Sequence, residues 1–339
     1  MKDALLLKIL KQALPYLRKH KRQVMVIKLG GELAARPELL HSLAEDISLL
    51  VHVGIRIVVV HGGGPQATEL AKRMGLEPTM VEGRRVTDEQ TLDVAKMVFG
   101  GKINTEILSA LLGQGVHAVG LSGVDAGILS ATRRRPTEMT CEETGEKRVV
   151  DFGFVGDVQS VDSTLLGLLM DNGYVPVLAS LGADAQGKIL NINADTVASV
   201  IAQDLKAGKL ISLTSVPGVL RDKDDPESLV TRLTASEARE ALTDGTVASG
   251  MKPKVAAVVD AVEHGVTRGH ILSGLEHGSV LMELFTREGC GTLIVGENEE
   301  AEAAAHTAAA DSSDAIAKTM GSLPGARRIK GRRSSGASA

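Results

Sequence analysis

The sequence predicts an α/β fold built around a mostly parallel sheet. Short aliphatic runs of three to six residues recur along the chain and are followed by turns rich in glycine. Stretches with the composition of helices lie between these runs. Continuous apolar runs are typical of strands buried on both faces, and strands that alternate with helices indicate a parallel sheet. In such sheets ligands bind at the carboxyl ends of the strands, where the glycines of this chain lie.

The elements follow one another in a regular order. Seven runs are predicted as strands: Val24–Lys28, Ile55–Val60, Val116–Leu121, Val175–Ala179, Lys209–Leu213, His270–Leu272 and Thr292–Val295. Seven stretches are predicted as helices: Glu38–Val51, Pro65–Arg73, Glu89–Val98, Asn104–Leu112, Asp195–Leu205, Ser236–Leu242 and Lys254–Glu263. The stretch Val149–Val161 alternates apolar and polar residues around a central glycine, so it is predicted as a β-hairpin insert.

The two ends of the chain differ from its body. Residues 1–22 contain apolar residues at helical spacing and are rich in lysine and arginine, which predicts an amphipathic helix with a kink at Pro15. This helix could dock on its own domain, pair with a partner helix or, as the weakest alternative, lie on a membrane surface. Residues 297–339 are rich first in alanine and then in serine, glycine and arginine. They lack the apolar surface of a stable fold, which predicts a disordered tail.

Composition excludes several classes of function. A net charge of -4 and an aromatic content of 2% argue against a nucleic-acid-binding protein. No apolar run reaches the ~18 residues of a membrane span. The two cysteines make neither a disulfide framework nor a zinc site, which favours a cytoplasmic protein without a metal centre. Gly101-Lys102 is followed by Ile103 and therefore does not form a P-loop, and no GxGxxG or GxSxG motif is present.

Two glycine loops follow predicted strands. Lys28 ends the first strand and precedes Gly30 and Gly31, while the segment 61–65, with the sequence HGGGP, ends the second strand and opens a helix. Backbone N–H groups that glycine exposes at a helix N-terminus bind anions well. The alternatives are a tight structural turn for the glycines and a solvated strand end for the lysine.

Five motifs together resemble one known family. They are IKLGGEL, VVVHGGGPQ, the segment 81–108 (VEGRRVTDEQTLDVAKMVFGGKINTEIL), NINADTVA and GMKPKV. In this order and spacing, over about residues 14–296, the sequence is similar to the amino-acid kinase family, and within it to the branch of arginine-sensitive acetylglutamate kinases. The resemblance implies an open α/β/α sandwich around a mainly parallel sheet of about eight strands. It also implies a substrate-binding and dimerisation lobe at 23–205 and a nucleotide-binding lobe at 206–296.

The activity implied by the resemblance is transfer of the γ-phosphoryl group of ATP, carried with Mg²⁺, to the side-chain carboxylate of N-acetyl-L-glutamate, the second step of arginine biosynthesis. A carboxylate is ionised at pH 7, so no general base is required. Catalysis is then expected to be positioning and charge neutralisation. The implied residues are Lys28, Lys254 and Asp195 for catalysis; Gly63, Gly64, Arg85 and Asn191 for the substrate; and Gly30, Gly31, Leu213, Ser215, Gly218, Leu220, Gly250 and Met251 for the nucleotide.

The resemblance also implies regulation and assembly. Feedback inhibition by arginine is expected at a C-terminal site that contains His270, Glu283 and Gly289, and the N-terminal helix is expected to link dimers into a hexamer. Two alternatives to the leading function stay open. One is another enzyme of the same family, acting on glutamate, on aminoadipate bound to a carrier protein or on UMP. The other is a non-catalytic relic that senses arginine.

Overall fold

The computed structural model describes Arg18 and residues 20–81, 84–140, 147–222, 224–248, 250–286 and 289–297. All of these except Glu297 belong to one unit, Met1–Gly296. The predictions of an N-terminal helix at residues 1–22 and of a disordered tail at 297–339 therefore lie almost wholly outside the described residues. No helix in the described part of the chain is long and apolar enough to span a membrane.

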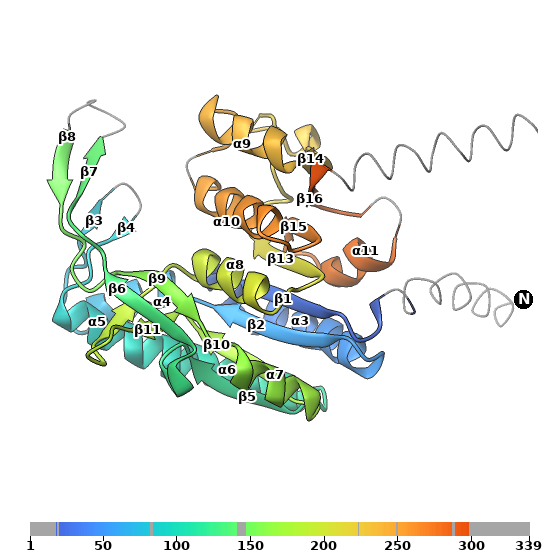
Figure 1. The fold of residues 1–339 in the computed structure, drawn as a ribbon, viewed down its shortest axis with the longest axis horizontal. Helices are drawn as coiled ribbons and strands as arrows, with labels where there is room; N and C mark the ends of the chain where they lie inside the picture. The colour runs from blue at the N-terminus through green and yellow to red at the C-terminus, as the bar shows by residue number, and fades with distance from the viewer. Residues whose placement is uncertain are drawn as a thin grey trace, which may run out of the picture. The chain divides into compact units, whose positions relative to one another are not determined.

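An eight-stranded sheet forms the centre of this unit, in the order β14–β16–β15–β13–β1–β2–β10–β5 (Figure 1). All neighbouring strands are parallel except β15 and β16. The strands are β1 (Val24–Leu29), β2 (Arg56–His61), β5 (Ala118–Ser122), β10 (Val175–Ala179), β13 (Lys209–Thr214), β14 (Arg232–Thr234), β15 (Arg268–Ser273) and β16 (Thr292–Val295). Seven of these were predicted from their aliphatic runs, and only the three-residue β14 was not.

Helices cover both faces of the sheet, which confirms the predicted α/β/α sandwich. One face packs against α2 (Gly31–Ala34), α3 (Pro37–His52), α4 (Gly64–Arg73), α5 (Glu89–Ala95), the π-helix η1 (Lys96–Ile103), α6 (Asn104–Gly113) and α11 (Ser279–Phe285). The other face packs against α7 (Thr164–Asp171), α8 (Ala194–Asp204), α9 (Ala235–Thr243) and α10 (Lys252–Glu263). Figure 1 shows α8 and α10 side by side on this second face.

The alternation of side chains along β1 decides which residues meet which layer. Met25 and Ile27 belong to the core under α3 and α6, whereas Val26 belongs to the core under α8 and α10. Successive side chains of a strand point to opposite faces. Lys28 therefore lies on the same face as Val26, toward α8 and α10.

The α5–η1–α6 segment is continuous, although the sequence predicted a break between Val98 and Asn104. The break is bridged by the π-helix η1, which contains Gly100 and Gly101. π-Helical turns inside α-helices occur frequently at functional sites. In this chain η1 packs against the loop that follows β2.

The prediction of a hairpin at Val149–Val161 was wrong. Its two strands belong to different sheets: β8 (Lys147–Val150) pairs with β7 (Thr137–Thr140), and β9 (Gly156–Val161) pairs with β6 (Leu129–Arg133). Gly153 lies between them at φ +69, where its N–H and C=O groups are turned toward other partners. An alternating pattern indicates a half-buried strand but not its partner, and here each strand pairs with a segment earlier in the chain.

Shorter elements complete the unit. A four-stranded sheet has the order β12–β11–β6–β9, and β3 pairs with β4. The remaining bounds are β3 (Met80–Val81), β4 (Arg84–Arg85), β11 (Leu181–Ala183), β12 (Ile189–Asn191) and the 3₁₀ turns η2 (Asp125–Gly127) and η3 (Pro226–Ser228). The sheet strands β1, β2, β10 and β13 end at the same edge, where we expect a ligand site.

Candidate active site

Two lysines and one aspartate form the charged centre of this edge. Lys28 lies near the end of β1 and is 5% exposed, and its Nζ is 2.8 Å from Oδ1 of Asp195. The Nζ of Lys254, in the first turn of α10, is 4.0 Å from Oδ2 of the same carboxylate. The structure thus brings together the three residues that the sequence analysis assigned to catalysis.

Local structure holds the aspartate between the two lysines. Asn193 is the N-cap of α8, and its side-chain Oδ1 accepts hydrogen bonds from the backbone N–H groups of Asp195, at 2.7 Å, and Thr196, at 3.3 Å. Asp195 therefore lies in the first turn of α8, where the helix dipole stabilises a carboxylate. Since α8 packs over β1, this turn faces Lys28. Sequence analysis did not single out Asn193, although an asparagine two residues before a helical acid is a recognised cap signal.

The centre places two lysines beside the single carboxylate of Asp195. Burial lowers the pKa of Lys254, Asp195 raises it, the nearby charge of Lys28 lowers it and the charge of Glu32 raises it. Two ammonium groups share one carboxylate, so the group is suited to neutralise an anion that approaches from the strand ends. Within the described ranges, no cluster of three or more histidine, cysteine, aspartate or glutamate side chains could hold a metal ion.

The two glycine loops pack against each other beside this centre. A Cβ atom added at Gly31 would lie 2.8 Å from Pro65 and 3.5 Å from the backbone nitrogen of Gly64. Gln66 donates a hydrogen bond to the carbonyl of Gly31 at 2.5 Å and so joins the loops. At Gly30 an added Cβ would lie 3.2 Å from the carbonyl oxygen of Leu213. A side chain at Gly31 is therefore excluded by the ring of Pro65, which opens the second loop's helix.

Gly63 and Gly64 differ in their surroundings, and this predicts different effects of alanine. An added Cβ at Gly63 would lie 2.3 Å from Cδ1 of Ile103 and 2.9 Å from the Phe99 ring, whereas an added Cβ at Gly64 meets nothing within 4 Å. Overpacking of a core costs about 1–3 kcal/mol, so Gly63→Ala is expected to lower the melting temperature by several degrees. Gly64→Ala is the matched control and should leave it nearly unchanged. Equal melting temperatures for the two variants would contradict the packing described here.

Arg85 and Asn191 lie in the surroundings of the second glycine loop. The Nη2 of Arg85 donates to the carbonyl of Gly64 at 2.9 Å and to the hydroxyl of Thr68. Its Nη1 is buried and has no hydrogen-bond partner among the described residues, and burial lowers the pKa of the guanidinium. Asn191 ends β12, where its side-chain amide donates to Thr87 Oγ1 at 3.2 Å. The unpartnered Nη1 of Arg85 can donate a hydrogen bond to a carboxylate that binds here.

Sequence analysis did not single out Thr87 and Phe154, which hold Asn191 in place. Thr87 is fully buried, and its backbone exchanges hydrogen bonds with Phe152 and Phe154. The carbonyl of Phe154 accepts the backbone N–H of Asn191 at 2.9 Å. These contacts join segments far apart in the sequence, and no local motif marks them.

The residues assigned to the nucleotide have mixed surroundings. Ser215 is exposed, whereas the side chain of Leu213 is 1% exposed in the core layer that lies away from Lys28. An added Cβ at Gly218 would lie 2.5 Å from Oγ1 of Thr292, so this glycine is a packing residue. The remaining members are Leu220, which bridges to Leu229, Gly250, whose carbonyl lies 3.4 Å from Lys254 Nζ, and Met251, whose sulfur lies 3.9 Å from Thr214 Oγ1.

The residues assigned to an effector site form a buried cluster at the other end of β15. His270 Nδ1 donates to Glu283 Oε1 at 2.7 Å, and Lys209 Nζ donates to His270 Nε2 at 2.9 Å. Burial lowers the pKa of His270 to about 4, so the imidazole is neutral at pH 7. The second oxygen of Glu283 accepts the backbone N–H groups of Cys290 and Gly291. Gly289, at φ +67, brings the backbone within reach of this carboxylate.

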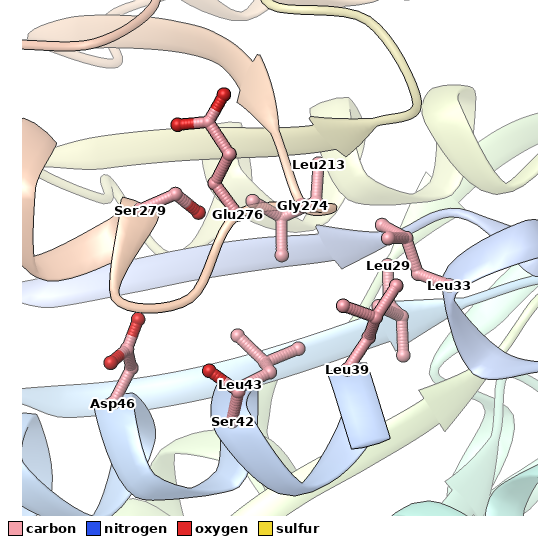
Figure 2. A pocket seen from close by; sticks show the side chains of 10 residues that line it. All are labelled: Leu29, Leu33, Leu39, Ser42, Leu43, Asp46, Leu213, Gly274, Glu276 and Ser279. Atoms are coloured by element: carbon pink, nitrogen blue, oxygen red, sulfur yellow. The ribbon is translucent and has the colours of Figure 1, made fainter. Parts of the chain in front are cut away.

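A small pocket lies between α3, the end of β1 and the start of α11. Figure 2 shows Asp46 of α3 directed toward the start of α11, where Ser279 lies, with Leu29 and Leu33 at the opposite end. Asp46 accepts hydrogen bonds from backbone N–H groups in the first turn of α11, and burial raises its pKa to about 6. The helix that carries Glu283 is thus attached to α3, which packs beneath the first glycine loop.

Comparison with known proteins assigns this chain to a family. The model of the amino acid kinase family matches residues 23–273, which include both glycine loops and the three charged residues. The chain belongs to the amino acid kinase family. Acetylglutamate kinase of Symbiobacterium thermophilum is 49% identical over 287 residues, which cover 85% of this chain and 96% of that protein. Acetylglutamate kinase of Methanothermobacter thermautotrophicus is 44% identical over 286 residues, which cover 84% and 98%.

Solved structures agree with this assignment to the amino acid kinase family. N-acetylglutamate synthase from Neisseria gonorrhoeae, solved with coenzyme A and N-acetyl-glutamate, is similar with a TM-score of 0.72 and 32% identity. The match covers 86% of this chain but only 63% of the synthase. A carbamate kinase from Giardia shares the fold, with a TM-score of 0.59 at 18% identity. The eight-stranded, mainly parallel architecture is therefore that of the family.

Proposed function

We propose that this chain transfers the γ-phosphoryl group of ATP to the side-chain carboxylate of N-acetyl-L-glutamate. Relatives named acetylglutamate kinase are 42–49% identical over 84–88% of the chain. The observation that carries the proposal is the Lys28–Asp195–Lys254 group at the ends of the sheet strands, with two glycine loops beside it. The product is an acyl phosphate, N-acetyl-L-glutamyl 5-phosphate. The reaction is the second step of arginine biosynthesis.

The chemistry needs charge neutralisation more than proton transfer. The acceptor carboxylate is already ionised at pH 7, so the main barrier is the approach of two anions. Lys28 and Lys254 supply two cations to the transferring phosphoryl group, and Asp195 keeps both in place. Preorganised donors of this kind contribute about 10²–10³-fold each. Backbone N–H groups of Gly30, Gly31 and the second glycine loop add further donors.

The acceptor fits the polar groups around the second glycine loop. The unpartnered Nη1 of Arg85 is suited to bind the α-carboxylate, because a guanidinium pairs with a carboxylate through two parallel hydrogen bonds. Asn191 offers an amide to the carboxylate and acetamido end, and Gly63 and Gly64 offer backbone donors. This arrangement favours an acylated amino acid over UMP.

The nucleotide is proposed to lie along the segment 213–220 and the turn at Gly250 and Met251. Backbone groups carry most of this contact, because the Leu213 side chain and Gly218 are engaged in packing. Mg²⁺ is proposed to arrive on the ATP phosphates, as it often does where the protein offers no carboxylate cage.

An assay of ADP release with four acceptors tests the proposal. The purified chain is given ATP and Mg²⁺ with N-acetyl-L-glutamate, L-glutamate, aminoadipate on a carrier protein or UMP. We expect turnover with N-acetyl-L-glutamate alone. Turnover with another acceptor and none with N-acetyl-L-glutamate would assign the chain to a different activity of the family. Absence of turnover with all four would favour the non-catalytic alternative.

We also propose that arginine inhibits this enzyme through the His270–Glu283–Gly289 cluster. The cluster offers a carboxylate that accepts three hydrogen bonds in a buried site, from His270 and from the backbone N–H groups of Cys290 and Gly291. A guanidinium that pairs with Glu283 would have to displace some of these donors, and it would then act on α11, which Asp46 attaches to α3.

Glu283→Gln is expected to weaken arginine binding about tenfold or more, because hydrogen bonds to charged groups contribute about 1.5–3 kcal/mol. Calorimetric titration with arginine measures this effect. Glu240→Gln, an exposed position on α9, is the control and should bind arginine like the unmodified chain. Equal affinity in the two variants would remove the cluster as the arginine site.

The assembly and cellular location of the chain are inferred from its family resemblance. A cytoplasmic homo-oligomer, either a dimer or a hexamer joined through residues 1–22, is proposed from the resemblance to arginine-sensitive members of the family. The lobes 23–205 and 206–296 are likewise proposed as the acceptor and nucleotide halves.

A further inference from the structure

A buried histidine lies directly beneath the second glycine loop. His61 ends β2 and is fully buried, and it is the residue before Gly62. Its Nδ1 donates to the carbonyl oxygen of Gly62 at 3.0 Å, and its Nε2 accepts from Nδ2 of Asn104 at 3.1 Å. Both ring nitrogens are therefore engaged inside the protein, and neither is directed at solvent.

Asn104 is itself held by the sheet. Its Nδ2 also donates to the carbonyl of Val177 in β10 at 3.0 Å. Asn104 is the first residue of α6, directly after the π-helix η1. It lies against β5, where an added Cβ at Gly120 would be 2.0 Å from its Oδ1. Contacts with β10 and β5 thus hold the side chain of Asn104, and its hydrogen bond holds the ring of His61.

The bond to Gly62 sets the direction of a backbone donor. A trans peptide is planar, so the N–H of Gly63 points away from the carbonyl of Gly62. Because His61 holds that carbonyl toward the interior, the Gly63 N–H is turned toward the outer side of the loop. Gly63 has no side chain to restrict this peptide, and an added Cβ there would meet Ile103 and Phe99.

We propose that His61 and Asn104 form a positioning pair that orients the Gly62–Gly63 peptide, so that the Gly63 N–H faces the transferring phosphoryl group and its acceptor carboxylate. This inference rests on the proposed function, because it names a donor for that reaction. His61 touches neither substrate and acts through the backbone of Gly62.

The protonation state of His61 agrees with this role. Burial lowers the pKa of His61 to about 4. The ring is therefore neutral between pH 6 and 9, with its proton on Nδ1, and Nε2 carries the lone pair that accepts the hydrogen bond from Asn104. A protonated ring would present an N–H at both positions and could not accept from Asn104. His61 is thus not the acid or base of the reaction.

The test compares three variants at a temperature where all are folded. His61→Leu fills much of the ring volume but removes both hydrogen bonds, and His61→Asn keeps a donor near the position of Nδ1. Val59→Ala is the control, because Val59 is fully buried on the same strand, two residues before His61, and its side chain belongs to the aliphatic core. Kinetics are measured with both substrates varied, and melting temperatures are recorded alongside.

A displacement of about 1 Å in a reacting geometry costs about 100-fold in rate. We expect His61→Leu to lower kcat/KM for the acceptor by about that factor, with KM for ATP within about twofold. His61→Asn should recover most of the loss. Val59→Ala should keep kcat/KM within about twofold even if its melting temperature falls further than that of His61→Leu.

The inference is overturned if His61→Leu keeps kcat/KM near that of the unmodified chain, or if it loses no more than Val59→Ala. It is also overturned if the pH profile of the unmodified chain shows an ionisation between pH 6 and 9 that His61→Asn lacks. If His61→Leu does not fold, His61→Asn is compared with Asn104→Ala instead. A larger loss of kcat in Asn104→Ala than in His61→Asn supports the pair. A kcat equal to that of the unmodified chain in both variants rejects it. Failure of the proposed function is distinct, because the unmodified chain would then not phosphorylate N-acetyl-L-glutamate.

Discussion

Replacing Lys28 with methionine is expected to lower kcat by about 1,000-fold, the upper range for loss of one preorganised donor. The ammonium group is buried and lies 2.8 Å from Asp195, so it is held in one position before the reaction begins. Methionine fills much of the same space but carries no charge. Water cannot replace the lost cation well at a position that is 5% exposed. Steady-state kinetics with saturating ATP and N-acetyl-L-glutamate measure the effect.

The matched control is Lys102→Met. Lys102 lies in η1 beside the site, but its side chain is 58% exposed and pairs with Glu106 at 3.0 Å. Exposed pairs one helical turn apart contribute about 0.3–0.5 kcal/mol, so this variant should retain near-normal kcat. If Lys28→Met kept kcat within tenfold of Lys102→Met, Lys28 would not stabilise the transferring group.

Asp195→Asn is expected to reduce kcat by about 100-fold and to move the alkaline limb of its pH profile to lower pH. Burial lowers the pKa of Lys254, and the carboxylate of Asp195 is the larger of two negative charges that raise it, the other being Glu32, while the charge of Lys28 lowers it. Without the carboxylate the pKa of Lys254 falls further. The ammonium form, which the reaction needs, is then lost at a lower pH. The pH dependence of kcat measures the shift.

Asp93→Asn serves as the control for this variant. Asp93 pairs with Lys96 on the surface of α5, and its side chain is 64% exposed. It should leave both kcat and the pH profile unchanged. An alkaline limb in Asp195→Asn that coincides with that of the unmodified chain would show that Asp195 does not control the ionisation of Lys254.

The main sheet could be predicted because its signals are local. A buried parallel strand is a continuous aliphatic run, and seven of eight strands carry such a run. Lys28 was placed at the end of a predicted strand and Asp195 at the start of a predicted helix, and their assignment to one site came from the resemblance to the amino-acid kinase family. Strand alternation then places Lys28 on the face that α8 and α10 cover.

The parts that could not be predicted depend on contacts between distant segments. The strands within Val149–Val161 pair with Thr137–Thr140 and Leu129–Arg133, and no feature of the alternating pattern selects those partners. The hydrogen bond between His61 and Asn104 joins residues 43 positions apart. The packing of Gly218 against Thr292 is also a tertiary contact, which the local sequence around this glycine does not indicate.

The most direct test of the account is to trap the product. The chain is incubated with ATP, Mg²⁺, N-acetyl-L-glutamate and hydroxylamine, which converts an acyl phosphate to a hydroxamate. We predict one hydroxamate for each ADP formed by the unmodified chain and by Lys102→Met, and almost none with Lys28→Met. Formation of ADP without hydroxamate, or an undiminished yield in Lys28→Met, would contradict phosphoryl transfer to a carboxylate by the Lys28–Asp195–Lys254 group.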